Sequence, residues 1–205
     1  MSNILDLLQG QLSEGLVDQL SQQMGADKAQ TQSAATGILS TLMGAIAKNA
    51  STPQGAESLN NALERDHDGS ILENLSGFLG GNAQAPANNN KMLNGAGILK
   101  HVLGGKQSNA IDMISKMSGL SGDKTGNMMA TLAPMVLGML GKQKREQGLD
   151  SSGISGMLSG MMGQAQQQRP EMGIIGKMLD ADGDGSYMDD LAEKGMGLLG
   201  KFLRK

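Results

Sequence analysis

Residues 38–48 read ILSTLMGAIAK and residues 132–142 read LAPMVLGMLGK, and these two stretches decide the fold. Except for its final lysine, each lies in a nearly uncharged run of 14 residues, at 34–47 and 128–141. Both runs are apolar on almost every side of a helix, which is typical of a buried helix. They are shorter than the ~20 residues that cross a bilayer. We therefore expect two buried helices and no membrane-spanning segment.

The neighbouring segments show the periodicity of amphipathic helices. Leucines recur at helical spacing in residues 5–12, and Leu16, Leu20 and Met24 share the next helical face. Gly25 follows directly and suits a left-handed helix stop. No stretch alternates with period two for long enough to predict a strand. The fold class that the sequence predicts is all-α.

The composition requires an unusual core. Aromatic residues are nearly absent, whereas the chain has 31 glycines and 17 methionines. Leu, Ile, Met and Ala must therefore fill the interior, and methionine adapts to irregular gaps. Gly37 and Gly44 are seven residues apart and share one helical face. We predict helix packing with close backbone approaches at these glycines.

Several classes of function are disfavoured. A net charge of −3 and the lack of aromatic side chains argue against nucleic acid as a partner. The chain has no cysteine, which excludes disulfides and thiolate chemistry. The N-terminus lacks the basic region of a signal peptide, so we predict a cytoplasmic protein. His67 and His101 are isolated, and no nucleophile elbow, phosphate loop or HExxH pattern occurs. We expect no enzyme and no small-molecule substrate.

The chain resembles itself when it is shifted by 94 positions. The matched stretches are ILDLLQG (4–10) with ILKHVLG (98–104), VDQLSQQMG (17–25) with IDMISKMSG (111–119), and 38–48 with 132–142. After an insertion of 22 residues, LERDHDGSILENL (63–75) matches LDADGDGSYMDDL (179–191). We interpret the chain as two tandem copies of a small multihelical bundle.

The predicted boundaries follow from this match. Residues 1–80 form the first repeat, and residues 81–94, which are polar and contain proline, form a linker. Residues 95–205 form the second repeat, with an inserted Gly/Gln-rich segment at about 150–172. Within that insertion, we predict that 163–171 is a loop or a flexible segment.

The acidic loop of the second repeat is the one candidate for specific chemistry. Carboxylates on alternate residues of a tight loop are typical of calcium sites, although position 12 of the calcium-loop pattern is Leu191 instead of glutamate. The candidate Ca²⁺ ligands are Asp180, Asp182, Asp184, Ser186, Asp189 and Asp190.

A second interpretation of both acidic loops is helix capping. Acidic residues are favourable at the positive end of a helix, and SILE (70–73) fits a capping box in which Ser70 accepts from the Glu73 backbone. The first loop lacks the last acidic positions of the second, so we favour calcium binding less there. Both interpretations stay open for residues 180–190.

The C-terminal segment 194–205 groups apolar residues with Lys194, Lys201, Arg204 and Lys205. Such a basic amphipathic helix either packs its apolar side on a bundle or lies on an anionic membrane surface.

Several of these motifs together resemble a known family. ILDLLQGQL, GILKHVLGG, LAPMVLGMLGK and the closing DGDGSYMDDL are similar to the YidB-like bacterial proteins of unknown function, domain of unknown function 937. The resemblance implies a small multihelical fold and supplies no activity. We therefore predict a non-enzymatic helical interaction or scaffold protein that binds a protein partner or itself. The alternative is a membrane-surface or envelope-associated protein that acts through its C-terminal helix.

Overall fold

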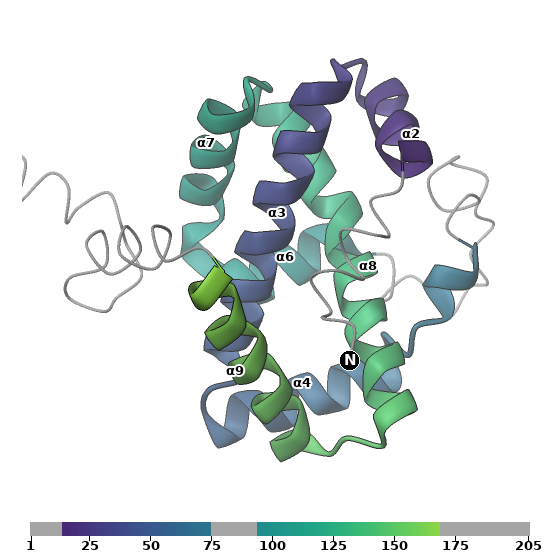
Figure 1. Ribbon diagram of the computed structural model, residues 1–205, viewed down its shortest axis with the longest axis vertical. Helices are drawn as coiled ribbons and strands as arrows, with labels where there is room; N and C mark the ends of the chain where they lie inside the picture. The colour runs from purple at the N-terminus through teal and green to yellow at the C-terminus, as the bar shows by residue number, and fades with distance from the viewer. Residues whose placement is uncertain (1–13, 75–93, 169–205) are drawn as a thin grey trace, which may run out of the picture. The chain divides into compact units, whose positions relative to one another are not determined.

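A computed structural model describes residues 14–74 and 94–168, and in these residues all regular structure is helical (Figure 1). The elements are α2 (Glu14–Met24), α3 (Lys28–Asn49), α4 (Pro53–Arg65), η1 (Ser70–Asn74), α6 (Gly95–Leu103), η2 (Gly104–Lys106), α7 (Gln107–Ser118), α8 (Gly122–Gln147) and α9 (Ser151–Gln168). The all-α prediction is confirmed for this part of the chain. None of the described helices is both long and apolar enough to cross a bilayer.

The two predicted buried helices form the centre of the structure. α3 packs against α7 and α8, and α8 also packs against α6 (Figure 1). Ile38 and Leu42 of α3 and Leu132 and Leu140 of α8 are each at most 1% exposed. These residues belong to one hydrophobic cluster that also contains side chains of α2, α6, α7 and α9. The described parts of the two predicted repeats therefore contribute to a single core.

The helix pairs α2–α3 and α7–α8 turn at equivalent positions. α3 starts at Lys28 and α8 at Gly122, which is 94 residues later. Gly25 and Gly119, at the ends of α2 and α7, both have a positive φ, of 54° and 78°. The offset found in the sequence thus describes two helical hairpins of the same register. Their origin by duplication stays a prediction.

Buried threonines show the same equivalence. The hydroxyl of Thr31 donates to the Asp27 carbonyl at 2.8 Å, and that of Thr125 donates to the Ser121 carbonyl at 3.0 Å. Both threonines are fully buried. Each buried hydroxyl is therefore satisfied inside the first turn of its own helix, which avoids the cost of an unpaired polar group.

Two reciprocal hydrogen bonds join the hairpins. Lys124 of α8 donates from its Nζ to the Gly25 carbonyl at 2.7 Å, at the end of α2. Gln30 of α3 donates from its Nε2 to the Gly119 carbonyl at 3.4 Å, at the end of α7. Gln30 and Lys124 are again 94 residues apart. Each hairpin thus supplies the side chain that satisfies a terminal carbonyl of the other.

α6 approaches α8 closely at a glycine. A Cβ on Gly95 would lie 1.8 Å from the Ala130 carbonyl oxygen, so no other residue fits there without movement. Pro134 lies inside α8 and has no N–H to donate to that same carbonyl, four residues earlier. The start of α6 therefore packs against a carbonyl that has lost its usual helical donor.

The predicted close approaches at Gly37 and Gly44 are wrong. A Cβ on Gly37 would meet the Ile114 side chain at an ordinary 3.5 Å, and a Cβ on Gly44 would meet nothing within 4 Å. At Gly37 a branched side chain of α7 fills the space that a neighbouring backbone would need. Spacing along α3 places two glycines on one face, but it does not show what lies opposite that face.

The predicted loop at 163–171 is also wrong at its beginning, because α9 continues to Gln168. Ile154, Leu158 and Met161 lie at helical spacing and are buried in the core. These contacts stabilise the helix despite its glycines. Alanine and glutamine then extend it, since both have good helix propensity.

We expect Gly95→Ala to lower the free energy of unfolding by about 2 kcal/mol, because the added methyl group must displace α6 or α8. Urea denaturation followed by circular dichroism measures this change. The matched control is Gly44→Ala, which adds the same methyl group in open space. Its expected effect is a gain of up to about 1 kcal/mol from helix propensity. Equal losses in both variants would contradict the proposed approach at Gly95.

Candidate functional site

The six predicted calcium ligands, Asp180, Asp182, Asp184, Ser186, Asp189 and Asp190, lie outside the described residues, as does the basic segment 194–205. The first copy of the acidic loop is described to Leu72. Within residues 14–74 and 94–168, no group of three or more His, Asp or Glu side chains is placed to hold a metal ion. The contacts of the first loop therefore indicate a structural role for its acidic residues.

The backbone of this loop lies directly on α8. A Cβ on Gly141 would lie 1.8 Å from the His67 carbonyl oxygen, and a Cβ on Gly138 would lie 2.6 Å from a methyl group of Ile71. Gly138 and Gly141 share one face of α8, so together they form a flat contact surface for the loop. Gly69 has a φ of 97°, which lets the chain turn between these two contacts.

The acidic side chains of the loop have local partners. Asp68 accepts from the Ser70 backbone N–H at 3.0 Å and lies 3.6 Å from Arg145 on α8. These interactions lower the pKa of Asp68, and the hydrogen bond from the Ser70 backbone is the largest cause. Asp68 therefore accepts a backbone N–H at the start of η1. The capping box predicted at Ser70 and Glu73 stays a prediction, because the Glu73 side chain lies outside the described residues. For the first loop, the geometry supports helix capping.

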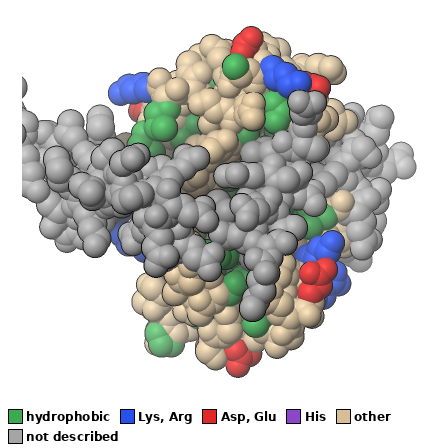
Figure 2. Space-filling view, viewed as in Figure 1, with side chains coloured by type: hydrophobic (Ala, Val, Ile, Leu, Met, Phe, Trp, Pro, Cys, Tyr) green, Lys and Arg blue, Asp and Glu red, His purple; other side chains and the backbone are tan. Residues whose placement is uncertain are grey.

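A second ion pair ties the end of α4 to α8. The Lys144 ammonium donates to the Glu64 carboxylate at 2.7 Å, and this hydrogen bond is the main cause of a lowered pKa at Glu64. The Lys144 side chain is 12% exposed and the Glu64 side chain 52%. Figure 2 shows Lys and Arg beside Asp and Glu around the edge of the described residues, without a broad patch of one sign on that face.

His67 is the most buried ionisable side chain described in this region. It is 5% exposed, and desolvation lowers its pKa. The neighbouring carboxylates of Asp66 and Asp68 act in the opposite direction and are weaker. His67 is therefore held neutral in the folded protein near neutral pH. Its burial under the loop suits a structural role more than that of a base.

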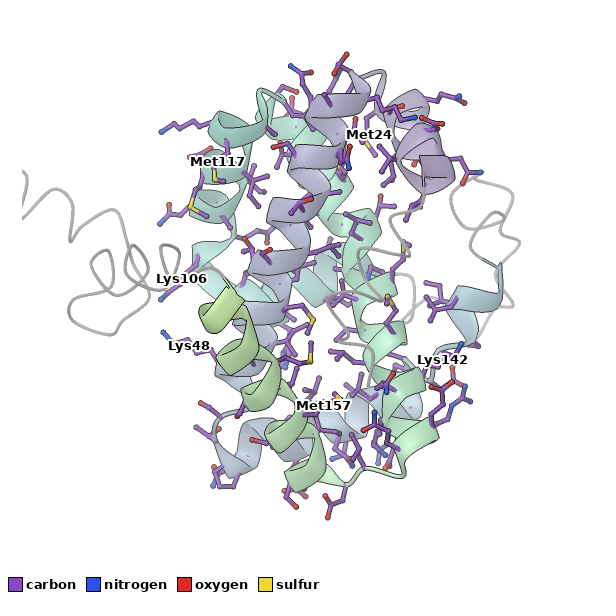
Figure 3. The ribbon with its side chains drawn as sticks, in the orientation of Figure 1. Met24, Lys48, Lys106, Met117, Lys142 and Met157 are labelled. Atoms are coloured by element: carbon purple, nitrogen blue, oxygen red, sulfur yellow. The ribbon has the colours of Figure 1, made fainter. Side chains whose placement is uncertain are left out.

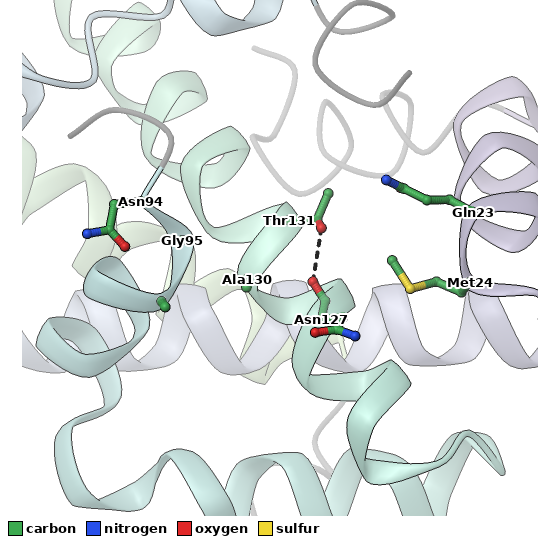
Figure 4. A pocket seen from close by; sticks show the side chains of 8 residues that line it. Gln23, Met24, Asn94, Gly95, Asn127, Ala130 and Thr131 are labelled. Carbon is green, nitrogen blue, oxygen red and sulfur yellow. Dashed lines mark hydrogen bonds between the residues drawn. The ribbon is translucent and has the colours of Figure 1, made fainter. Parts of the chain in front are cut away.

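An open hollow of about 580 Å³ lies between α2, the start of α6 and α8 (Figure 4). Gln23 and Met24 line it on α2, and Asn127 and Thr131 line it on α8. The Thr131 hydroxyl donates to the Asn127 carbonyl at 2.9 Å, so it serves its own helix. The described lining residues offer neutral hydrogen-bonding groups and no acid, base or activated nucleophile.

Comparison with known proteins identifies a family. A model described as bacterial protein of unknown function (DUF937) matches residues 6–143. The chain belongs to the DUF937 family. This confirms the family that the sequence motifs predict. No curated protein and no solved structure matches the chain.

The DUF937 match covers α2 to most of α8, and it ends before α9 and before the predicted calcium ligands. The matched region contains the hydrogen bonds between the hairpins and the Gly95 contact. It also contains Gly138 and Gly141, which contact the first acidic loop. The family match therefore concerns the shared helical core.

Among the described residues of this DUF937 protein, the exposed large apolar side chains lie on α7, and no sequence pattern indicated them. Met113 is 42% exposed and Met117 is 67% exposed, and they are the large apolar side chains that stand out from the described surface. Figure 3 shows Met117 on the outer side of α7. The segment also contains Ile111 and Ile114, so apolar residues alone do not indicate which side of α7 faces the solvent.

We expect the stability of the protein to fall as the pH drops below about 6.5, partly because of His67. The folded pKa of His67 is lowered from 6.5, so the unfolded chain binds the proton first. The contribution is complete above pH 6.5 and is lost progressively on acidification. His67→Gln should flatten the pH dependence of the free energy of unfolding between pH 5 and 7. An unchanged pH dependence in this variant would contradict the role of His67.

Proposed function

We propose that this chain is a non-enzymatic helical interaction protein, which acts by presenting a helix surface to another protein. The single observation that supports this proposal is the exposed pair Met113 and Met117 on α7. Methionine is adaptable and polarisable, and it is common on surfaces that bind other proteins. The two side chains are four residues apart, so they form one continuous thioether strip along the helix.

The rest of the described core is well suited to hold that strip in place. Ala110 and Ile114, on the adjoining face of α7, are buried against the central helices. The exposed methionines therefore project from a helix whose inner side is fixed. A surface on a rigid element loses little conformational entropy when it binds a partner.

The test is a comparison of two tagged chains expressed at the native level, the wild type and the double variant Met113→Gln/Met117→Gln. Glutamine has a similar length and good helix propensity, so the fold should persist, and circular dichroism checks this. We expect at least one protein, or a second copy of the chain, to be enriched with the wild type and lost with the variant. Identical sets of bound proteins would contradict a role for this strip.

Calcium binding at Asp180, Asp182, Asp184, Ser186, Asp189 and Asp190 is a separate proposal. The expected result is a shift of the Gly183 and Gly185 amide NMR signals when calcium is added to the purified protein. Asp182→Asn/Asp184→Asn should abolish the shift, because it removes two carboxylates from the ligand set. The amide of Gly69 in the first loop serves as an internal control and should not move. An unchanged spectrum at millimolar calcium would rule out the site.

A further inference from the structure

The outer side of α7 differs from that of its structural equivalent α2. With the offset of 94, Met113 and Met117 correspond to Gln19 and Gln23, which are exposed amides. The two helices begin hairpins of the same register, so the difference lies in side chains and not in backbone. Of these two equivalent helices, α7 carries the apolar strip and α2 does not.

The charges next to the strip differ as well. In the first hairpin, Asp18 forms an ion pair with Lys28 at 2.7 Å. Its equivalent in the second hairpin is Asp112, but the position of Lys28 is taken by Gly122. Asp112 is thus left without the partner that its counterpart has. In the described part of the chain, neither Asp112 nor the exposed Lys116 takes part in an ion pair.

This arrangement is complementary to itself. Asp112 and Lys116 are one helical turn apart, and the methionine strip runs beside them. Two copies of α7 that lie antiparallel around a twofold axis would place Asp112 of each copy opposite Lys116 of the other. The same axis would place the Met113 and Met117 strip of one copy beside that of its partner. A contact of this kind closes on itself and forms a dimer.

We propose that α7 is a self-association surface, and that its partner is a second copy of this chain in antiparallel α7 to α7 contact. This inference rests on the proposed function, because it names the partner of the same methionine strip. A single pair of 12-residue helices buries less area than the ~800 Å² per partner of a standard interface. The dimer is therefore a weak one, populated at high protein concentration.

The test is a charge-reversal series on the full chain, measured by sedimentation equilibrium from micromolar to millimolar concentration. Asp112→Lys and Lys116→Asp should each weaken the dimer about tenfold, because every reversal replaces two symmetric attractions by repulsions. The double variant Asp112→Lys/Lys116→Asp restores both pairs and should return close to the wild-type dissociation constant. A structural role of either residue would not produce this recovery.

A second measurement reports on the methionines directly. Hydrogen peroxide converts an exposed thioether to the sulfoxide and is itself reduced to water, so its rate at Met117 reports exposure. We expect this rate to fall as protein concentration rises, as measured by peptide mass spectrometry. Met128 and Met129 are fully buried and serve as internal controls. Met113→Gln/Met117→Gln gives α7 the residues of α2 and should abolish the dimer.

Each outcome has a definite meaning. A wild type that stays monomeric up to millimolar concentration overturns the inference. A dimer that is indifferent to both charge reversals and to the methionine variant also overturns it, because another surface must then be used. In either case, a different protein captured by the wild type and lost with Met113→Gln/Met117→Gln would leave the proposed function standing. If neither a dimer nor such a protein partner is found, the proposed function is overturned too.

Discussion

The packing of α3 against α8 is the contact on which the rest of the described structure depends. Both helices are apolar on nearly every side, so neither is stable until other helices cover it. The other helices meet this need, and α7 and α6 pack against the pair directly. With 2 Phe, no Trp and a single Tyr in the chain, this core is filled by small and flexible side chains. Its specificity then depends on backbone contacts, and the Gly95 approach to the Ala130 carbonyl is the clearest of them.

The first acidic loop packs against α8 through the same kind of close backbone contact at glycine that joins α6 to α8. Gly138 and Gly141 let its backbone reach α8, while Asp68 and Glu64 form ion pairs with Arg145 and Lys144 at the rim. The carboxylates thus hold a turn against a helix. This arrangement in one copy does not decide what the acidic loop at 180–190 does, since the two loops differ in their last acidic positions.

The helical class and the two central helices could be predicted from the sequence because apolar periodicity reports burial directly. The end of α2 was also predicted, since Gly25 marks a left-handed stop, and its equivalent Gly119 ends α7 in the same way. The close backbone approaches could not be predicted, because nothing in the sequence distinguishes Gly44 from Gly141 until the opposing carbonyl is known. The α7 surface was hidden for a related reason: Ile114 and Met117 are both apolar, and only packing separates the buried side from the exposed one.

The two hydrogen bonds that join the hairpins look symmetric but differ in chemistry. At the end of α2 the donor is the charged ammonium of Lys124, whereas at the end of α7 it is the neutral amide of Gln30. A cation at a helix C-terminus gains from the helix dipole, and salt screens that gain, while an amide contact is almost indifferent to salt. Rising ionic strength therefore weakens the Lys124 junction and leaves the Gln30 junction almost unchanged. Two hairpins of the same register therefore respond unequally to salt, and high ionic strength weakens the junction at the end of α2 more than the one at the end of α7.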